Sequence, residues 1–418
     1  MTESPAPADV SNGLMLPTPV PTRARTAVAA VFFINGAVLA SWLPHIPDLK
    51  ARLGISDGGL GLVLLGMAVG AVIALPVAGW LVGRVGSPAI TSASALGLCA
   101  TVTLPVLTPN VALTVAALGL LGAWNAILDV AMNAQGVSVE EAYGRPIMSS
   151  FHALFSLGGL VGAGGAALAM SFGLGAAIHL IVVAGFSMGA AAIALGGLVP
   201  TPHVQGRVDP VFVRPPAALL GLGLLTFCAL LAEGAMGDWT AVYLRDSLKA
   251  TPALAATGFA AFSLTMAVGR FCGDGLASRM GAAALLRASG TLAAAGLAVS
   301  LLIGHASAAI VGFGLVGLGV ANLIPILFSA AGRAPGFPAA TALAAVATTG
   351  YCGYLAGPPL IGLAADVVGL PLALGIVCVT CGIVAAGAAV IPRSSQAPAS
   401  PRNNVSKAST LTAEAPHG

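Results

Sequence analysis

Residues 111–137, VALTVAALGLLGAWNAILDVAMNAQGV, form an apolar run whose only charged residue is Asp129. A helix needs about 20 consecutive, mostly apolar residues to cross a bilayer, so this run is long enough to span a membrane. Similar runs recur along the whole chain, and none shows the strand-period alternation of a transmembrane barrel. The sequence therefore predicts an all-α membrane protein with twelve spans, near 26–46, 59–82, 89–107, 111–137, 147–172, 175–199, 217–245, 254–277, 283–303, 306–331, 339–365 and 370–391.

The composition supports the same class. Hydrophobic residues make up 57% of the 418 positions and charged residues only 7%, with a mean hydropathy of +0.97. A soluble domain carries roughly 25% charged residues, so this chain lacks the polar surface of a cytosolic enzyme. The net charge is +3 and the basic residues are thinly spread, which excludes a nucleic-acid partner. We expect a monomer whose surroundings are the lipid bilayer.

The distribution of Lys and Arg predicts the orientation. With the N-terminus inside, the outer loops hold only Lys50, Arg52, Arg245 and Lys249, while the inner segments hold twelve basic residues. Cytoplasmic segments carry the excess of Lys and Arg, so both termini are expected in the cytoplasm of a cell with this protein in its inner, plasma membrane. The expected divisions are a disordered tail 1–25, a six-helix bundle 26–199, a cytoplasmic loop 200–216, a second six-helix bundle 217–391 and a disordered tail 392–418.

The two halves also resemble each other. Arg84 and Gly86, at the end of the second run, recur as Arg279 and Gly281, at an offset of 195 positions. Gly119 and Gly122 in the fourth run recur as Gly314 and Gly317 at the same offset, and further matches follow in the same order. A parallel repeat of six spans predicts two pseudo-symmetric bundles with a substrate site between them.

The segment Gly79-Trp80-Leu81-Val82-Gly83-Arg84-Val85-Gly86-Ser87 resembles the signature loop of the major facilitator superfamily, Gly-x-Leu-x-Asp-Arg-x-Gly-Arg. In this chain Gly83 replaces the usual Asp, and Ser87 the second basic residue. Phe32-Phe33-x-x-Gly36 and Leu128-Asp129-x-x-x-Asn133 are similar to the fucose–proton-symporter-like branch and its bacterial inner-membrane relatives. The resemblance implies a secondary transporter whose first, fourth, seventh and tenth helices line a central cavity.

Two acids lie deep within runs that should be buried in lipid, Asp129 in the fourth and Glu233 in the seventh. An intramembrane charge is costly and normally faces a cavity or a partner, so both are predicted to couple protons or to bind substrate. The sequence does not assign the two roles. The alternative for Asp129 is a polar packing network between helices, and for Glu233 a structural contact at a helix break near Gly234.

Other polar and aromatic residues of the cavity helices are candidate solute contacts. Asn125 and Asn133 flank Asp129 at i−4 and i+4 and share its face. The remaining candidates are Asn35, Trp124, Asp238, Trp239 and Asn322, which lies three residues before the helix-kinking Pro325. Tyr351 and Tyr354, in the eleventh run, are expected outside the cavity.

Charged residues at the inner ends of the runs predict a cytoplasmic gate. In the superfamily the signature Asp docks on the start of helix 11, and Gly83 removes that contact here. By pseudo-symmetry Asp274 is expected to dock on the start of helix 5, where Arg145 and free N–H groups favour an anion. Arg84, Arg270 and Arg279 complete the predicted gate. The alternative is that Arg270 and Asp274, four residues apart, form an intrahelical ion pair.

The function predicted from these features is secondary active transport of a small polar solute by alternating access, coupled to protons. No GxxxxGK[ST] nucleotide motif is present, and no cofactor or metal site is expected. The alternatives are an exporter or uniporter of amphipathic molecules and, more remotely, an intramembrane enzyme. Ser150 and His152 do not share a helix face, so the chain is not expected to be an enzyme.

Overall fold

The computed structural model describes residues 22–144, 147–199, 217–337 and 339–391, without the side chains of Asp274 and residues 339–341. All regular structure within these ranges is helical. Twelve helical segments are long and apolar enough to cross a membrane, and each overlaps one of the predicted runs. The predicted all-α class with twelve spans is confirmed.

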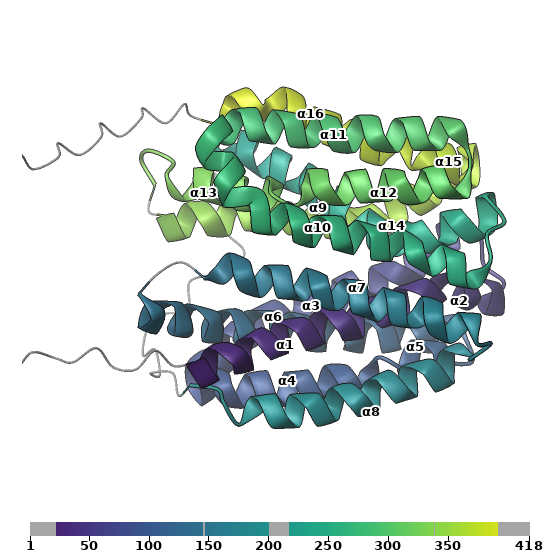
Figure 1. Cartoon of the computed structure of the whole chain (residues 1–418), viewed down its shortest axis with the longest axis horizontal. Coiled ribbons are helices and arrows are strands. Elements are labelled where there is room, and N and C mark those ends of the chain that lie inside the picture. The colour runs from purple at the N-terminus through teal and green to yellow at the C-terminus, as the bar shows by residue number, and fades with distance from the viewer. Residues whose placement is uncertain (1–21, 145–146, 200–216, 338, 392–418) are drawn as a thin grey trace, which may run out of the picture.

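The elements fall into two halves that lie side by side, α1–α8 and α9–α16 (Figure 1). The first half contains α1 (Thr22–Trp42), η1 (Leu43–His45), α2 (Ile46–Leu53), α3 (Asp57–Val85), α4 (Ser87–Thr101), α5 (Leu104–Leu107), α6 (Val111–Tyr143), α7 (Met148–Ser171) and α8 (Ala176–Leu195). The second half contains η2 (Ala217–Leu219), α9 (Leu220–Val242), η3 (Tyr243–Ser247), α10 (Pro252–Met280), α11 (Ala282–Ile303), α12 (Ala306–Val320), α13 (Leu323–Gly332), α14 (Ala339–Val368), α15 (Leu370–Ala373), α16 (Gly375–Ala386) and η4 (Gly387–Val390).

Helix packing repeats from one half to the other. In the first half α1 packs on α7, α3 on α6 and α4 on α8. The corresponding spans of the second half make the same pairs, α9 with α14, α10 with α12 and α11 with α16. The seam between the halves is also paired symmetrically, because α7 packs on α10 and α14 on α3. This arrangement agrees with the internal repeat of the sequence.

Small residues set the closest approaches of the helices. A Cβ on Gly158 of α7 would clash with the carbonyl of Phe33 in α1, and one on Gly61 of α3 with the carbonyl of Pro358 in α14. Close backbone contact of this kind is how membrane helices gain packing energy without a hydrophobic driving force between them. The second contact joins the two halves directly.

The first helix begins earlier than the sequence indicated. The disordered tail was expected to reach residue 25, but residues 22–25 already belong to α1. Arg23 donates to the carbonyl of Gly196 at 3.1 Å, and Arg25 donates to the Tyr143 hydroxyl at 2.7 Å. These two bonds fix the first turn against α8 and α6. The other residues of both expected tails and of the loop 200–216 lie outside the described residues.

The molecule has two opposite ends. The terminal face is the end at which α1 begins and η4 ends, and the distal face is the opposite end, which carries α2, η3 and α15 (Figure 1). The tenth span is broken between α12 and α13 at Ala321 and Asn322. Pro325 follows the break, as its missing N–H predicts.

Candidate functional site

A charged group joins the two halves near the middle of the seam. The guanidinium of Arg270, on α10, contacts Oε1 of Glu233 on α9 at 3.4 Å. The same side chain donates to Oγ of Ser156 on α7 at 2.7 Å. The side chains of Arg270 and Glu233 are only 13% and 17% exposed, so solvent screens this pair weakly. An ion pair of one half is therefore anchored to the other half by a hydrogen bond.

Two tyrosines of α14 lie between the predicted acids. The Tyr354 ring packs against Gly234, where an added Cβ would come within 2.7 Å of it. Tyr354 lies within electrostatic range of Glu233, Arg270 and Asp129, and Tyr351 within range of Asp129. We expected these tyrosines outside the cavity, and the structure places them near the acids predicted for it. Their three-residue spacing, which places both on one helix face, was the available signal.

Asp129 lies on the first-half side of this group. Its carboxylate accepts a hydrogen bond from Nδ2 of Asn133 at 3.1 Å, one helical turn away. It makes no ion pair with any other described residue. The Oδ1 atom of Asn125, one turn earlier, is buried without a hydrogen-bond partner. The polar strip of α6 therefore keeps unused hydrogen-bonding capacity beside the tyrosines of α14.

Asp238 and Trp239 lie on α9, toward the distal face from Glu233. No described residue makes a hydrogen bond or ion pair with the partly exposed Asp238 carboxylate. Trp239 is completely buried, and its ring approaches Gly362 of α14. Asp238 thus adds a second unpaired carboxylate near the seam, whereas Trp239 belongs to the packing beneath the distal face.

Three other predicted cavity residues make contacts inside their own halves. Nδ2 of Asn35 lies 3.7 Å from the sulfur of Met132 on α6. The Trp124 ring covers Gly97 of α4. Asn322 donates to the carbonyl of Gly269 on α10 at 3.0 Å and is 7% exposed. For these residues the described contacts indicate packing between neighbouring helices.

The predicted cytoplasmic gate is not assembled among the described residues. Arg84 is exposed and stacks on Trp80 at 5.4 Å, and Arg279 is also exposed. Arg270 pairs with Glu233. Arg145 and the side chain of Asp274, and with them the intrahelical Arg270–Asp274 alternative, lie outside the described residues.

The N–H groups that this gate would use are already occupied. Those of Ile147 and Met148, at the start of α7, both donate to Oε2 of Glu140 at 2.7 Å. Glu140 belongs to the same half. The assumption that the start of this helix is free is therefore wrong, because the end of α6 supplies an anion to it.

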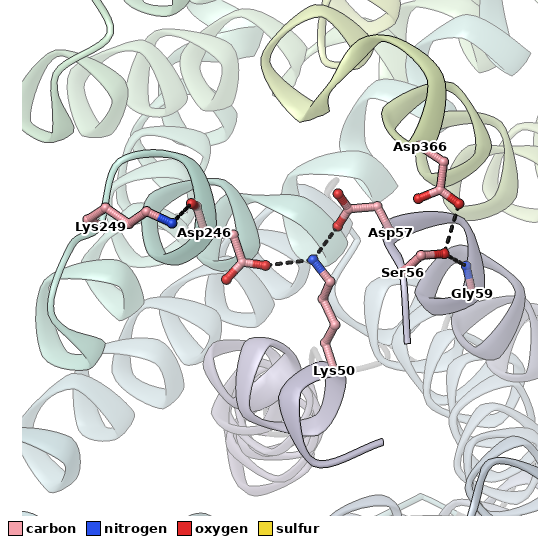
Figure 2. Close-up of polar contacts among 7 residues, drawn as sticks. All are labelled: Lys50, Ser56, Asp57, Gly59, Asp246, Lys249 and Asp366. Atoms are coloured by element: carbon pink, nitrogen blue, oxygen red, sulfur yellow. Dashed lines mark hydrogen bonds and ion pairs between the residues drawn. The ribbon is translucent and has the colours of Figure 1, made fainter. Parts of the chain in front are cut away.

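The distal face is held by a network of ion pairs that the sequence did not predict (Figure 2). Nζ of Lys50 lies 2.6 Å from Oδ1 of Asp57 in its own half and 2.6 Å from Oδ2 of Asp246 in the other half. Arg245 donates to Asp48 at 3.1 Å, and the hydroxyl of Ser56 donates to Asp366 at 2.8 Å. We call these four contacts the distal closure.

Among the described residues, no ion pair joins the two halves at the terminal face. Hydrogen bonds between described residues of the two halves include Lys50–Asp246, Arg245–Asp48 and Ser56–Asp366 at the distal face, and those of Arg270 to Ser156 and His152. Lys50 and Arg245 had been interpreted only as orientation signals. The available clue was that acids and bases lie close together in both outer segments, from Asp48 to Asp57 and from Arg245 to Lys249.

A separate groove of about 580 Å³ lies between α3 and α6. Its lining is apolar or glycine throughout, and Leu62, Ile73 and Val77 on its wall are exposed. It contains none of the predicted site residues. Such a surface suits acyl chains rather than a polar solute.

Comparisons with known proteins agree with this architecture. The sequence profile of the major facilitator superfamily matches residues 28–340. The chain belongs to this superfamily. It is 39% identical to an uncharacterized MFS-type transporter of Yersinia pestis over 368 residues, 87% of this chain and 94% of the relative. It is therefore a membrane transporter, and the predicted membership is confirmed.

Solved members of the superfamily share the fold. The nucleoside transporter NupG superposes with a TM-score of 0.69 at 13% identity, over 88% of this chain and 100% of that one. The fucose–proton symporter FucP of E. coli superposes with a TM-score of 0.55 at 17% identity, over 88% and 98%. At these identities the likeness concerns the arrangement of helices.

Proposed function

We propose that this transporter is a secondary active carrier that moves a small polar solute by alternating access, with protons as the coupling ion. The observation that carries the proposal is the Arg270–Glu233 pair, held to Ser156 of the opposite half, with Tyr354 within electrostatic range of both this pair and Asp129. Polar groups at this depth are costly unless they serve a pathway or a partner. Here they lie where the two halves meet.

The unpaired groups form the proposed solute site. Asn125, Asp129 and Asp238 retain hydrogen-bond acceptors that no described residue uses. The hydroxyls of Tyr351 and Tyr354 add donors between the two halves. A solute with several hydroxyl or amine groups would pair with such a surface, and its binding would draw the halves together.

The paired group forms the proposed coupling element. A proton on Glu233 removes its negative charge and with it the attraction to Arg270. The Arg270 guanidinium would then keep only its hydrogen bonds to α7, which alters the contact between the halves. Asp129 has no basic partner to lose, so we assign proton coupling to Glu233 and solute binding to Asp129.

The same proposal orients the molecule. The excess of basic residues at the terminal face supports a cytoplasmic location for that face and both termini, and the distal face would then lie outside the inner membrane. The described state is then closed to the outside by the distal closure. Alternating access requires these contacts to break when the outward-open state forms.

Transport by the purified protein in proteoliposomes tests the proposal. A thermal-shift screen of sugars, amino acids and organic acids first selects a ligand, and its uptake is then measured with and without an inwardly directed proton gradient. We expect the gradient to accelerate uptake. Glu233→Gln should abolish the acceleration while retaining exchange of the solute across the membrane, and Asp129→Asn should remove the thermal shift.

Glu141→Gln is the matched control, because Glu141 is an exposed carboxylate on the same helix as Asp129. It should behave as the unsubstituted protein does. Uptake that ignores the gradient would contradict proton coupling, and an unchanged thermal shift in Asp129→Asn would contradict the proposed solute site.

A further inference from the structure

Two buried histidines meet beside the distal closure. Nε2 of His45, in η1, lies 2.9 Å from Nδ1 of His179, near the start of α8. The two side chains are 1% and 6% exposed, and their ring centroids are 5.2 Å apart. On its other side, Nδ1 of His45 faces Oδ2 of Asp48 at 3.8 Å. Asp48 in turn pairs with Arg245 of the opposite half, so the imidazoles connect to the closure itself.

The ionisable groups around this pair come from few elements. In the distal parts of α4, α5, α7 and α10, which pack on α8 or η1, only the thiol of Cys99 is ionisable. The other ionisable groups of the neighbouring distal elements are Asp48, Lys50 and Arg52 of α2, Asp238 of α9, and Tyr243, Arg245 and Asp246 of η3. Lys50 and Arg245 are each paired with an acid, which leaves Asp48 as the carboxylate nearest to His45.

Counting hydrogen-bond donors shows that this pair is suited to one added proton. In the neutral pair one imidazole donates across the 2.9 Å contact and the other accepts. Nδ1 of His45 is buried and has no hydrogen-bond partner. If His45 takes up a proton, Nε2–H donates to His179 and Nδ1–H points toward the Asp48 carboxylate. A second proton, on His179, would remove the acceptor and place two cations in contact.

We propose that the His45–His179 pair is a proton-binding site of this transporter, and that one bound proton strengthens the distal closure through Asp48 and Arg245. Acid on the outer side then favours the state closed to the outside, the direction needed to carry protons inward. This inference rests on the proposed alternating access, but it concerns a site separate from Glu233 and Asp129.

Hydrogen–deuterium exchange of the full-length protein in lipid nanodiscs tests the proposal. Exchange in segments 43–57 and 243–251 is compared at about pH 7.5 and about pH 5.5, on the two sides of the usual imidazole titration, after correction for intrinsic rates. We expect corrected exchange to be roughly five-fold slower at the lower pH, the effect of one added hydrogen bond on an equilibrium constant. His45→Gln should lose this pH dependence.

Two further variants keep the result interpretable. Asp48→Asn, at a side chain 45% exposed, should fold normally and should also reduce the difference in exchange between the two pH values. His305→Asn is the control, because the exposed His305 only caps α12 and Asn can replace it as a cap. The proposal would be overturned if exchange in the unsubstituted protein did not depend on pH, if it changed in the opposite direction, or if both His45→Gln and Asp48→Asn kept the full pH dependence of the unsubstituted protein.

Uptake assays on the same proteins separate this proposal from the proposed function. If uptake responds to the proton gradient while exchange near His45 does not change with pH, only the imidazole proposal fails. If uptake ignores the gradient, the coupling mechanism fails, and the exchange experiment alone then decides whether the histidine pair binds a proton.

Discussion

The seam and the distal face both place charged residues between the halves, but they pair them differently. At the distal face Lys50 contacts two carboxylates, and Arg245 and Ser56 each contact one. At the seam Arg270 and Glu233 form a pair, while Asp129 and Asp238 have no basic partner among the described residues. The distal groups are thus largely satisfied by the protein, and those at the seam are not.

The two regions therefore suit different functions, since one stabilises a conformation and the other can bind a ligand. A satisfied network stabilises one conformation and has little capacity left for a ligand. Unused acceptors in a low-dielectric region carry a desolvation cost that a bound solute or proton can offset. The distal closure therefore suits stabilisation of one conformation, and the seam suits a binding site.

The largest effect is expected from removing the charge that joins the two halves at the seam. Arg270→Gln would leave Glu233 partly buried without its cation, at a cost of about 2 kcal/mol or more, and coupled uptake should fall at least about ten-fold. Adding Glu233→Gln should restore thermal stability without restoring coupled uptake. Thermal unfolding and gradient-driven uptake of the single and double variants measure both outcomes, and recovery of coupling in the double variant would refute the assignment.

The next effect concerns the distal closure. Lys50→Gln removes the cation shared by Asp57 and Asp246 and should shift the balance toward the outward-open state by roughly five-fold, since such partly exposed pairs contribute about 1 kcal/mol. Faster hydrogen exchange in 43–57 and 243–251 would report the shift. Lys249→Gln is a suitable control, because Lys249 contacts only the backbone of Asp246 in its own half. Equal effects of the two variants on exchange would show that Lys50 does not stabilise the distal closure.

The membrane explains which of these features the sequence predicted. Span number, the two bundles and the depth of Asp129 and Glu233 follow from long apolar runs and rare charges, which are strong signals. The rotation of each helix is not encoded so clearly, because the lipid-facing and packed sides are both apolar. Trp124, predicted as a cavity residue, covers Gly97, and Tyr354, expected outside the cavity, lies within electrostatic range of Glu233.

Contacts distant in sequence were the other limit. Arg270 has an acid four residues away at position 274, and the sequence offers no means of preferring Glu233, which comes from another helix. Lys50 of α2 and Asp246 of η3 lie at equivalent places in the two halves, and their contact depends on how the halves pack against each other. Acids and bases close together after the first and seventh spans are the trace of the distal closure in the sequence.

A smaller effect is expected at Ser56, which contributes to the distal closure and also caps its own helix. Its hydroxyl caps α3 by accepting from N–H of Gly59 at 3.1 Å and donates to Asp366 at 2.8 Å. Ser56→Ala should lower stability by about 1 kcal/mol, the usual cost of losing a cap. Asp366→Ala would retain the Ser56 cap but remove the acceptor of its hydroxyl. If that variant were as stable as the unsubstituted protein but showed faster distal exchange, the bond to Asp366 would stabilise the distal closure. The cap would then account for the effect on folding stability.

The smallest effect is expected from salt, and it distinguishes the two regions without any substitution. The Arg245–Asp48 pair is partly exposed, at 25% and 45%, whereas Arg270 and Glu233 are 13% and 17% exposed. Exposed pairs are screened strongly when the Debye length falls from about 10 Å at 0.1 M salt to about 3 Å at 1 M. Distal exchange should therefore rise modestly with salt while exchange around 229–237 and 266–274 stays constant. If the seam responded as strongly as the distal face, the Arg270–Glu233 pair would be open to water, and its assignment as a protected coupling element would have to be abandoned.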